Sequence, residues 1–308
     1  MQRRWVLVGA GAAVAGWWIL RRPAPLSRAA FAVTYAVPLA PPAEPVATYH
    51  LGHSLVGRDM PAMLAAWAGH DHASQLGWGT SLQAHRKGDI AGFDTENAHP
   101  AYRPVNEALA SGDYGAVVLT EMVEIRDAIR WHDAARELAH WARTARAGNP
   151  VVRVYLYETW HPLDDPEGWL TRLDADLSRH WEDEILRPAL AEKGVGAIHV
   201  IPAGQAMAAA VRAMEAGEVP GMTDRRQLFG LTPEGAADMI HLGDWGNWLV
   251  AMVHHAVIYH RLPAAAPVLH ADGSPGTPLP PGAEAALRQV VWRTVTGYPA
   301  TGVAPAKG

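Results

Sequence analysis

Two short segments, far apart in the chain, carry residue types that suit nucleophilic catalysis. Ser54 lies in Leu51-Gly52-His53-Ser54-Leu55, directly after an apolar run, and Asp238 precedes His241 by three residues. A serine on a strand-to-helix turn exposes its hydroxyl near backbone N–H groups, although a serine there is more often a helix cap. Asp238 can hold Nδ1 of His241 from one turn, which leaves Nε2 to take the serine proton. The order Ser54, Asp238, His241 therefore predicts a catalytic triad.

The elements that must position these residues follow from the alternation of β-prone and helix-compatible runs. The β-prone runs are Ala47–Leu51, Ser74–Trp78, Tyr114–Thr120, Val151–Tyr157 and Ala197–Pro202. The helix-compatible runs are Asp59–Ala68, Arg103–Ala110, Val123–Arg146, Pro166–Glu192 and Gly204–Ala216, followed by Asp244 to Tyr259 and Gly282–Val295. This pattern predicts an α/β fold whose parallel sheet is covered on both faces. Ligands gather beyond the carboxyl ends of such strands, and Ser54 falls there.

The first block Gly52-His53-Ser54-Leu55, Gly79 and Asp238-x-x-His241 together resemble the SGNH (GDSL-like) hydrolase superfamily over about Val46 to Tyr259. The resemblance implies a flavodoxin-like three-layer α/β/α sandwich with a five-stranded parallel sheet, the SGNH hydrolase fold. It implies that Ser54 is the nucleophile, that His241 is the general base and then acid, and that Asp238 orients His241. The N–H groups of Ser54 and Gly79 would form part of an oxyanion hole.

Two positions depart from the family pattern. His53 stands where the family has an aspartate, a position that is not catalytic. The asparagine that donates to the oxyanion after the middle strand is missing, because Ala116-Val117-Val118-Leu119 runs into Thr120-Glu121. Thr120, through its hydroxyl, or a protonated Glu121 is the candidate replacement in the oxyanion hole.

For other polar residues near the same edge of the sheet, the sequence gives weaker evidence of a role in binding substrate or metal. Glu158, Trp160 and His161 follow the fourth strand and are candidate substrate-binding residues for an acyl or sugar subsite, with packing as an equal alternative. His70-Asp71-His72 offers two imidazoles, but its place between a helix and a strand favours a polar surface turn over a metal pair. The sequence therefore predicts no metal site and no cofactor.

The amino-acid composition argues against several classes of function. The 308 residues are 49% hydrophobic and 19% charged, with 26 Lys+Arg against 31 Asp+Glu, so the chain is globular and carries a net charge of -5. The sequence holds no long basic run, which argues against a nucleic-acid partner. The absence of cysteine excludes disulfides, iron–sulfur clusters and cysteine nucleophiles.

The N-terminus predicts export or membrane attachment. An uncharged apolar run from Trp5 to Leu20 lies between two arginine pairs, so residues 1–22 are expected to be a signal peptide or membrane anchor. A dinucleotide-binding turn is the alternative for this glycine-rich run, but the third small residue and the following acidic residue are missing. Residues 23–45 are expected to be a Pro/Ala-rich linker, 46–296 the SGNH hydrolase-like domain and 297–308 a flexible tail.

These observations predict a serine acyl-ester hydrolase, or an acyltransferase of the same chemistry, in the bacterial cell envelope, periplasmic or membrane-anchored. The expected substrate is a small ester, with an O-acylated carbohydrate among the candidates, and the N-terminal segment would contact the membrane. The alternative is a catalytically weak SGNH-fold protein that binds a glycan or assists envelope assembly. A metalloprotein that uses the histidines ranks below both, because no recognised ligand spacing is present.

Overall fold

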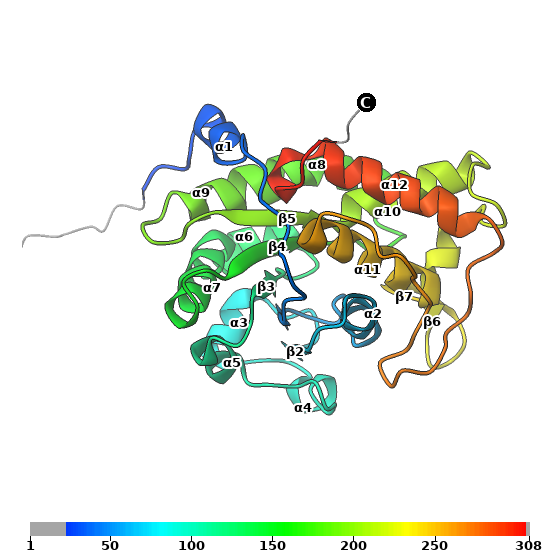
Figure 1. Ribbon diagram of the computed structural model, residues 1–308, viewed down its shortest axis with the longest axis horizontal. Coiled ribbons are helices and arrows are strands. Elements are labelled where there is room, and N and C mark those ends of the chain that lie inside the picture. The colour runs from blue at the N-terminus through cyan, green and yellow to red at the C-terminus, as the bar shows by residue number, and fades with distance from the viewer. Residues whose placement is uncertain (1–22, 306–308) are drawn as a thin grey trace, which may run out of the picture.

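The computed structural model describes residues 23–305, which form a three-layer α/β/α sandwich around one parallel sheet (Figure 1). The sheet has the order β2-β1-β3-β4-β5, and all four neighbouring pairs are parallel. Its strands are β1 (Thr48–Leu51), β2 (His72–Gln75), β3 (Ala116–Leu119), β4 (Arg153–Glu158) and β5 (Ile198–Pro202). The predicted flavodoxin-like fold with a five-stranded parallel sheet is confirmed.

Helices cover both faces of the sheet, which explains why β1 and β3 are buried along their whole length. One face packs against α2 (Asp59–Ala68), α10 (Ala203–Glu215), α11 (Asp244–Tyr259) and α12 (Ala283–Gly297). The opposite face packs mainly against α5 (Val105–Ser111) and α7 (Ala134–Gly148), together with a π-helical segment, Leu177–Leu186. Shorter helices complete the described chain: α3 (Leu82–Lys87), α4 (Phe93–Glu96), α6 (Ile125–Trp131), α8 (Trp169–Asp176) and α9 (Arg187–Leu190).

The structure divides two helices that the sequence predicts as continuous. The run Val123–Arg146 is split into α6 and α7, because Asp133 adopts a left-handed conformation with φ 55°. The run Pro166–Glu192 begins only at Trp169 and changes from α8 into the π-helical segment before α9. Both differences lie on the faces of the sheet and leave the strand order unchanged.

A two-stranded hairpin that the sequence analysis missed precedes α11. It pairs β6 (Phe229–Leu231) with β7 (Ala237–Leu242) in antiparallel orientation, after a 3₁₀ turn at Arg225–Leu228. Asp238 and His241 lie on β7, so the expectation that one turn carries both residues is wrong. The Thr232-Pro233-Glu234-Gly235 stretch is a typical turn signal between two short β-prone runs.

The ends of the described chain pack on the domain. Residues 23–45 are not an extended linker, because they contain α1 (Arg28–Thr34) and the buried Tyr35, whose hydroxyl donates to the Ile198 carbonyl across 2.5 Å. The expected flexible tail is also ordered through Val303, which is buried after a 3₁₀ turn at Pro299–Thr301. The predicted signal or anchor lies outside the described residues. Within residues 23–305, no helix combines the length and the apolar character needed to cross a membrane.

Candidate active site

The structure brings Ser54, His241 and Asp238 together in one hydrogen-bonded chain. Ser54 Oγ lies 3.0 Å from His241 Nε2, and His241 Nδ1 lies 3.0 Å from Asp238 Oδ2. When Nδ1 carries the ring proton, Asp238 accepts it and Nε2 is left to accept the hydroxyl of Ser54. The imidazole is 49% exposed, so this chain of atoms opens to the solvent. The arrangement can activate a serine oxygen.

Asp238 is fixed by the backbone of its own strand. Its Oδ1 accepts hydrogen bonds from the N–H groups of Ile240 and His241, each at 2.8 Å. Partial burial opposes ionisation of Asp238, but these two bonds and the His241 imidazole outweigh it and lower the pKa of the carboxyl. Asp238 therefore stays ionised at neutral pH, with its second oxygen directed at the imidazole.

The loop after β4 attaches β7 to the domain. The Trp160 indole N–H donates to the Ile240 carbonyl across 2.8 Å, and the Leu163 N–H donates to the Met239 carbonyl across 2.8 Å. Both acceptors lie between Asp238 and His241 on β7. Because Trp160 is fully buried, it connects an otherwise partly exposed strand to the core. We identify Trp160 as a positioning residue for the Asp238–His241 pair.

The Ser54 turn rests on two buried histidines. His53 Nδ1 accepts from the Leu55 N–H, so its Nε2 donates to the Glu121 carbonyl at 2.7 Å. His85 Nε2 lies 2.8 Å from the Gly52 carbonyl. Burial lowers the pKa of both imidazoles to about 4, so both are neutral at pH 7. Sequence reasoning treated His53 only as a departure from the family and missed His85; the position of His53 beside Ser54 was the available signal.

Two backbone N–H groups, one at Ser54 after β1 and one at Gly79 after the neighbouring strand β2, are available as donors. Among residues 23–305, the N–H groups of Ser54 and Gly79 find no hydrogen-bond acceptor. Gly79 is exposed and has φ 53°, a left-handed conformation that glycine adopts without strain. Unpaired N–H groups at a reacting centre can stabilise a developing oxyanion.

Neither of the predicted side-chain donors after β3 fits the oxyanion hole. The Thr120 hydroxyl donates to the Tyr157 carbonyl at 2.8 Å, and its methyl group fills the space where a Cβ on Gly52 would lie. Glu121 is buried, and its Oε1 accepts from the N–H groups of Leu82 and Met122. Its Oε2 is enclosed without a partner in the described chain. Both assignments are wrong, because these side chains point into the protein rather than toward solvent.

The predicted substrate-binding residues after β4 are also enclosed. Glu158 accepts from the Gln205 N–H, and burial raises the pKa of its carboxyl to about 8. His161 Nε2 lies 2.9 Å from Asp176 Oδ2, and Trp160 holds β7 as described above. Glu158, Trp160 and His161 are each 2% exposed or less, so none of them can line a subsite. The alternative interpretation, that these three side chains pack inside the protein, is therefore correct.

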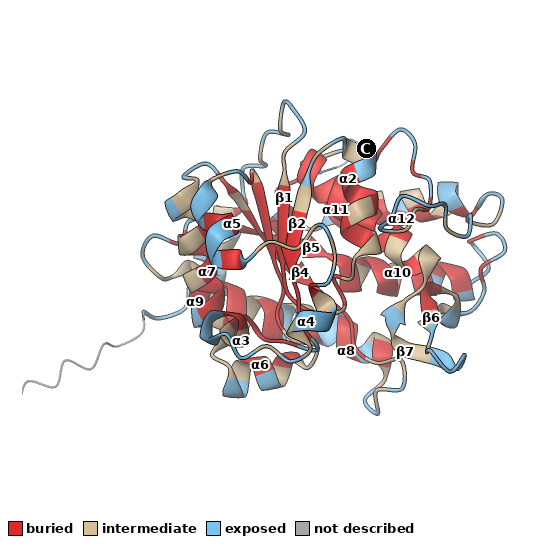
Figure 2. Cartoon of the chain, turned by 90° about the horizontal axis from the view of Figure 1, so that it is seen from below, coloured by how far each residue is buried: buried red, intermediate tan, exposed pale blue. Residues whose placement is uncertain are grey.

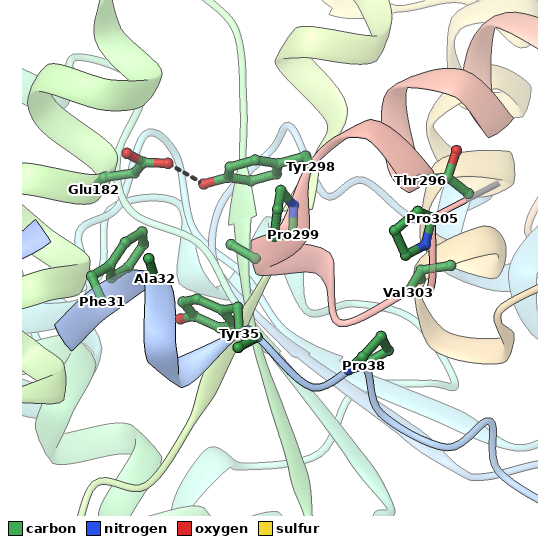
Figure 3. A pocket seen from close by; sticks show the side chains of 12 residues that line it. Phe31, Ala32, Tyr35, Pro38, Glu182, Thr296, Tyr298, Pro299, Val303 and Pro305 are labelled. Carbon is green, nitrogen blue, oxygen red and sulfur yellow. Dashed lines mark hydrogen bonds between the residues drawn. The ribbon is translucent and has the colours of Figure 1, made fainter. Parts of the chain in front are cut away.

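A sizeable apolar cavity lies away from the Ser54–His241 pair. It has a volume of about 400 Å³ and is enclosed between α1 and the C-terminal segment, with Phe31, Tyr35 and Tyr298 among its walls (Figure 3). Tyr298 donates to Glu182 at its margin. This cavity belongs to the packing of the two chain ends. Within the described part of the chain, no group of three or more His, Asp or Glu side chains is arranged to hold a metal ion.

Comparison with proteins of known structure supports the fold described above. No family model matches the chain, and no curated protein matches it. It is similar to the crystal structure of a DUF4886 family protein from Bacteroides uniformis, with a TM-score of 0.53 and 15% identity over 83% of this chain and 96% of the other. A candidate GDSL-like lipase from Parabacteroides merdae aligns with a TM-score of 0.39 and 13% identity, over 68% and 94%. The chain thus shares its fold with a DUF4886 family protein of known structure.

Proposed function

We propose that the protein is a serine ester hydrolase in which Ser54, His241 and Asp238 form the catalytic triad. The observation that carries this proposal is the pair of 3.0 Å contacts that join Ser54 Oγ, the two imidazole nitrogens and Asp238 Oδ2. Three residues from β7 and the β1–α2 turn meet in the geometry that nucleophilic catalysis requires.

The reaction proceeds through an acyl-enzyme. Ser54 Oγ bonds to the ester carbonyl carbon while its proton passes to His241 Nε2, and the carbonyl oxygen becomes an oxyanion facing the N–H groups of Ser54 and Gly79. When the tetrahedral intermediate collapses, the C–O bond to the alcohol breaks and His241 returns the proton to that alcohol. A water molecule, or a sugar hydroxyl in a transferase, then repeats the sequence on the acyl-enzyme and restores Ser54.

The Thr120 hydroxyl already donates to a carbonyl inside the protein and cannot donate to the oxyanion, which favours a low rate of hydrolysis. Removing one oxyanion donor from a hydrolase costs about 2.7–4 kcal/mol of transition-state stabilisation. Because the Thr120 hydroxyl donates to Tyr157, the backbone donors must act without it. The same observation supports the second candidate, a catalytically weak protein that holds a glycan. The apolar run before residue 23 supports a place for either in the cell envelope.

Hydrolysis of p-nitrophenyl acetate and butyrate tests the proposal. We expect measurable turnover by the full chain, near-complete loss in Ser54→Ala and in His241→Ala, and no further loss in the double variant, because triad members act as a unit. A double variant far slower than either single variant would contradict the shared mechanism. Turnover that survives Ser54→Ala would place the chemistry elsewhere.

A further inference from the structure

Two tryptophans stand out as exposed among the large apolar side chains of the described residues. Trp131 is 63% exposed and Trp78 is 55% exposed. Trp78 immediately precedes Gly79, whose N–H is an oxyanion donor in the proposed mechanism. It is also the third residue after β2, as Ser54 is the third residue after β1, and these neighbouring strands pair Leu51 with Gln75. The exposed indole therefore lies at the same edge of the sheet as the nucleophile.

The Trp78 ring is held in one orientation. Its Nε1 donates to Glu96 Oε1 at 2.8 Å, and its backbone N–H donates to the Ala91 carbonyl at 2.8 Å. One face of the indole packs on Gly92, where an added Cβ would lie 2.2 Å from Cδ2, so only glycine permits this approach. Gly92 also has φ 67°, which favours glycine. The opposite face of a fixed aromatic ring is thus left to the solvent.

A residue directly after α4 also helps to hold the loop that carries Trp78. Asn97, directly after α4, is buried and clamps the loop that carries Trp78: its Oδ1 accepts from the Leu76 N–H at 2.9 Å, and its Nδ2 donates to the Leu76 carbonyl at 2.8 Å. In Figure 2, α4 and β7 lie at the same end of the sheet. Residues 91–97 therefore support the indole in an exposed position at the same edge of the sheet as Ser54.

A rigid, exposed aromatic face binds a flat apolar partner without the entropy cost of ordering a side chain. Glu96 adds a polar group at the edge of the ring, because its Oε1 accepts from the indole while its Oε2 makes no hydrogen bond or ion pair with the described residues. A sugar ring matches both features: its C–H face packs on an aromatic ring while its hydroxyls donate to a carboxylate. An alkyl chain would offer no donor to the second carboxylate oxygen of Glu96.

We propose that Trp78 is the platform of a subsite for a sugar ring, with Glu96 accepting a hydroxyl, and that the substrate is an ester carried by a carbohydrate. The proposal rests on the proposed ester hydrolase function. It assigns specificity to the alcohol side of the ester, because the sugar that Trp78 would hold is the alcohol from which the acyl group is cleaved. Trp78 then binds the sugar, and Ser54 attacks an acyl group that the sugar carries.

Sugar binding can be measured without catalysis. In a Ser54→Ala background, isothermal titration with unacylated xylotetraose, cellotetraose and chitotetraose should detect binding of at least one sugar, and Trp78→Ala should weaken it about tenfold or more. Trp78→Phe should retain most of the affinity, since the aromatic face remains. Trp131→Ala, which removes the other exposed tryptophan, is the matched control and should leave the affinity unchanged. No binding to any of the three sugars, or an equal affinity in Trp78→Ala, would overturn the proposal.

Kinetic measurements test the sugar subsite at Trp78 separately from the ester hydrolase function. With acetylated oligosaccharides, Trp78→Ala should raise KM, and the loss in kcat/KM should be about tenfold greater than the loss for p-nitrophenyl acetate. If Trp78→Ala instead impairs p-nitrophenyl butyrate more than the sugar ester, the platform binds the acyl group and the sugar assignment is wrong. Sugar binding without hydrolysis of any ester would retain the subsite and refute the hydrolase.

Discussion

The Trp160 indole donates to the Ile240 carbonyl across 2.8 Å, and thereby ties the loop after β4 to the strand that carries Asp238 and His241. The strand itself is partly exposed and belongs to a hairpin outside the main sheet. A few such contacts must therefore keep the imidazole within reach of Ser54. A displacement of about 1 Å at a reacting group can cost on the order of 100-fold in rate.

Trp160→Phe tests this attachment. The phenyl ring keeps most of the packing but removes the donor to Ile240, so we expect kcat for p-nitrophenyl acetate to fall about three- to tenfold with little change in KM. The matched control is Trp248→Phe, which also removes a buried indole bond, but one whose acceptor, the Ala266 carbonyl at 2.7 Å, is not on β7. Equal kcat values in the two variants, at equal thermal stability, would show that Trp160 has only a structural role.

Asp238→Asn should impair the chemical step through the tautomer of His241. Asparagine still accepts backbone N–H groups but presents an amide N–H to Nδ1, which drives the ring proton to Nε2 and blocks proton transfer from Ser54. We expect kcat to fall on the order of 100- to 10,000-fold, at most as far as in Ser54→Ala, with an unchanged melting temperature. Steady-state kinetics and a thermal melt check both; a variant with wild-type kcat would remove Asp238 from the mechanism.

Glu121→Gln should change how stability depends on pH. Burial raises the pKa of Glu121 to about 7 from an ordinary value of 4.5, so the folded chain holds this proton between those values and the unfolded chain does not. The stabilisation of the folded state that comes from this bound proton is therefore complete below pH 4.5 and is lost as the pH rises through 7. Glutamine removes this titration and retains an acceptor for the Leu82 and Met122 N–H groups. Relative to wild type, the variant should gain at most about 3 kcal/mol between pH 4.5 and 8 in denaturant unfolding; parallel stability curves would contradict the buried, protonated carboxyl.

Truncation of the N-terminus distinguishes a packed segment from a linker. Removal of residues 1–45 deletes buried Tyr35 and the Ala40 carbonyl that accepts from Arg153. By analogy with the loss of a buried aromatic side chain, the melting temperature should fall by roughly 10 °C relative to a chain that lacks only residues 1–22. Coincident melting curves would show that residues 23–45 contribute nothing to the domain.

The sheet and the nucleophile could be predicted because their signals are local. Each strand is a short apolar run, and Ser54 follows β1 within a few residues, so the edge it occupies is fixed by the parallel arrangement. The spacing of Asp238 and His241 also carried enough information to pair them, although they lie on a strand rather than a helical turn. Asp238 reaches His241 from the strand because its side chain folds back on its own backbone, where Oδ1 accepts from the N–H groups of Ile240 and His241.

The orientation of side chains after a strand could not be predicted from position alone. Thr120 and Glu158 were both expected at the mouth of the site, yet the first donates to Tyr157 and the second accepts from Gln205. Which face a residue takes depends on strand register and on the length of each strand to within one residue. The support of Trp78 by Gly92 and Glu96 likewise joins loops whose contact no local pattern encodes.

Covalent labelling with a fluorophosphonate probe tests the central claim most directly, because the probe phosphonylates a serine only when a base has activated it. Intact-mass and peptide analysis should show one adduct, located on Ser54, in the full chain. Ser54→Ala should show none, and His241→Ala should label at a strongly reduced rate while remaining folded. A full chain that stays unlabelled, or an adduct on any serine other than Ser54, would contradict the account.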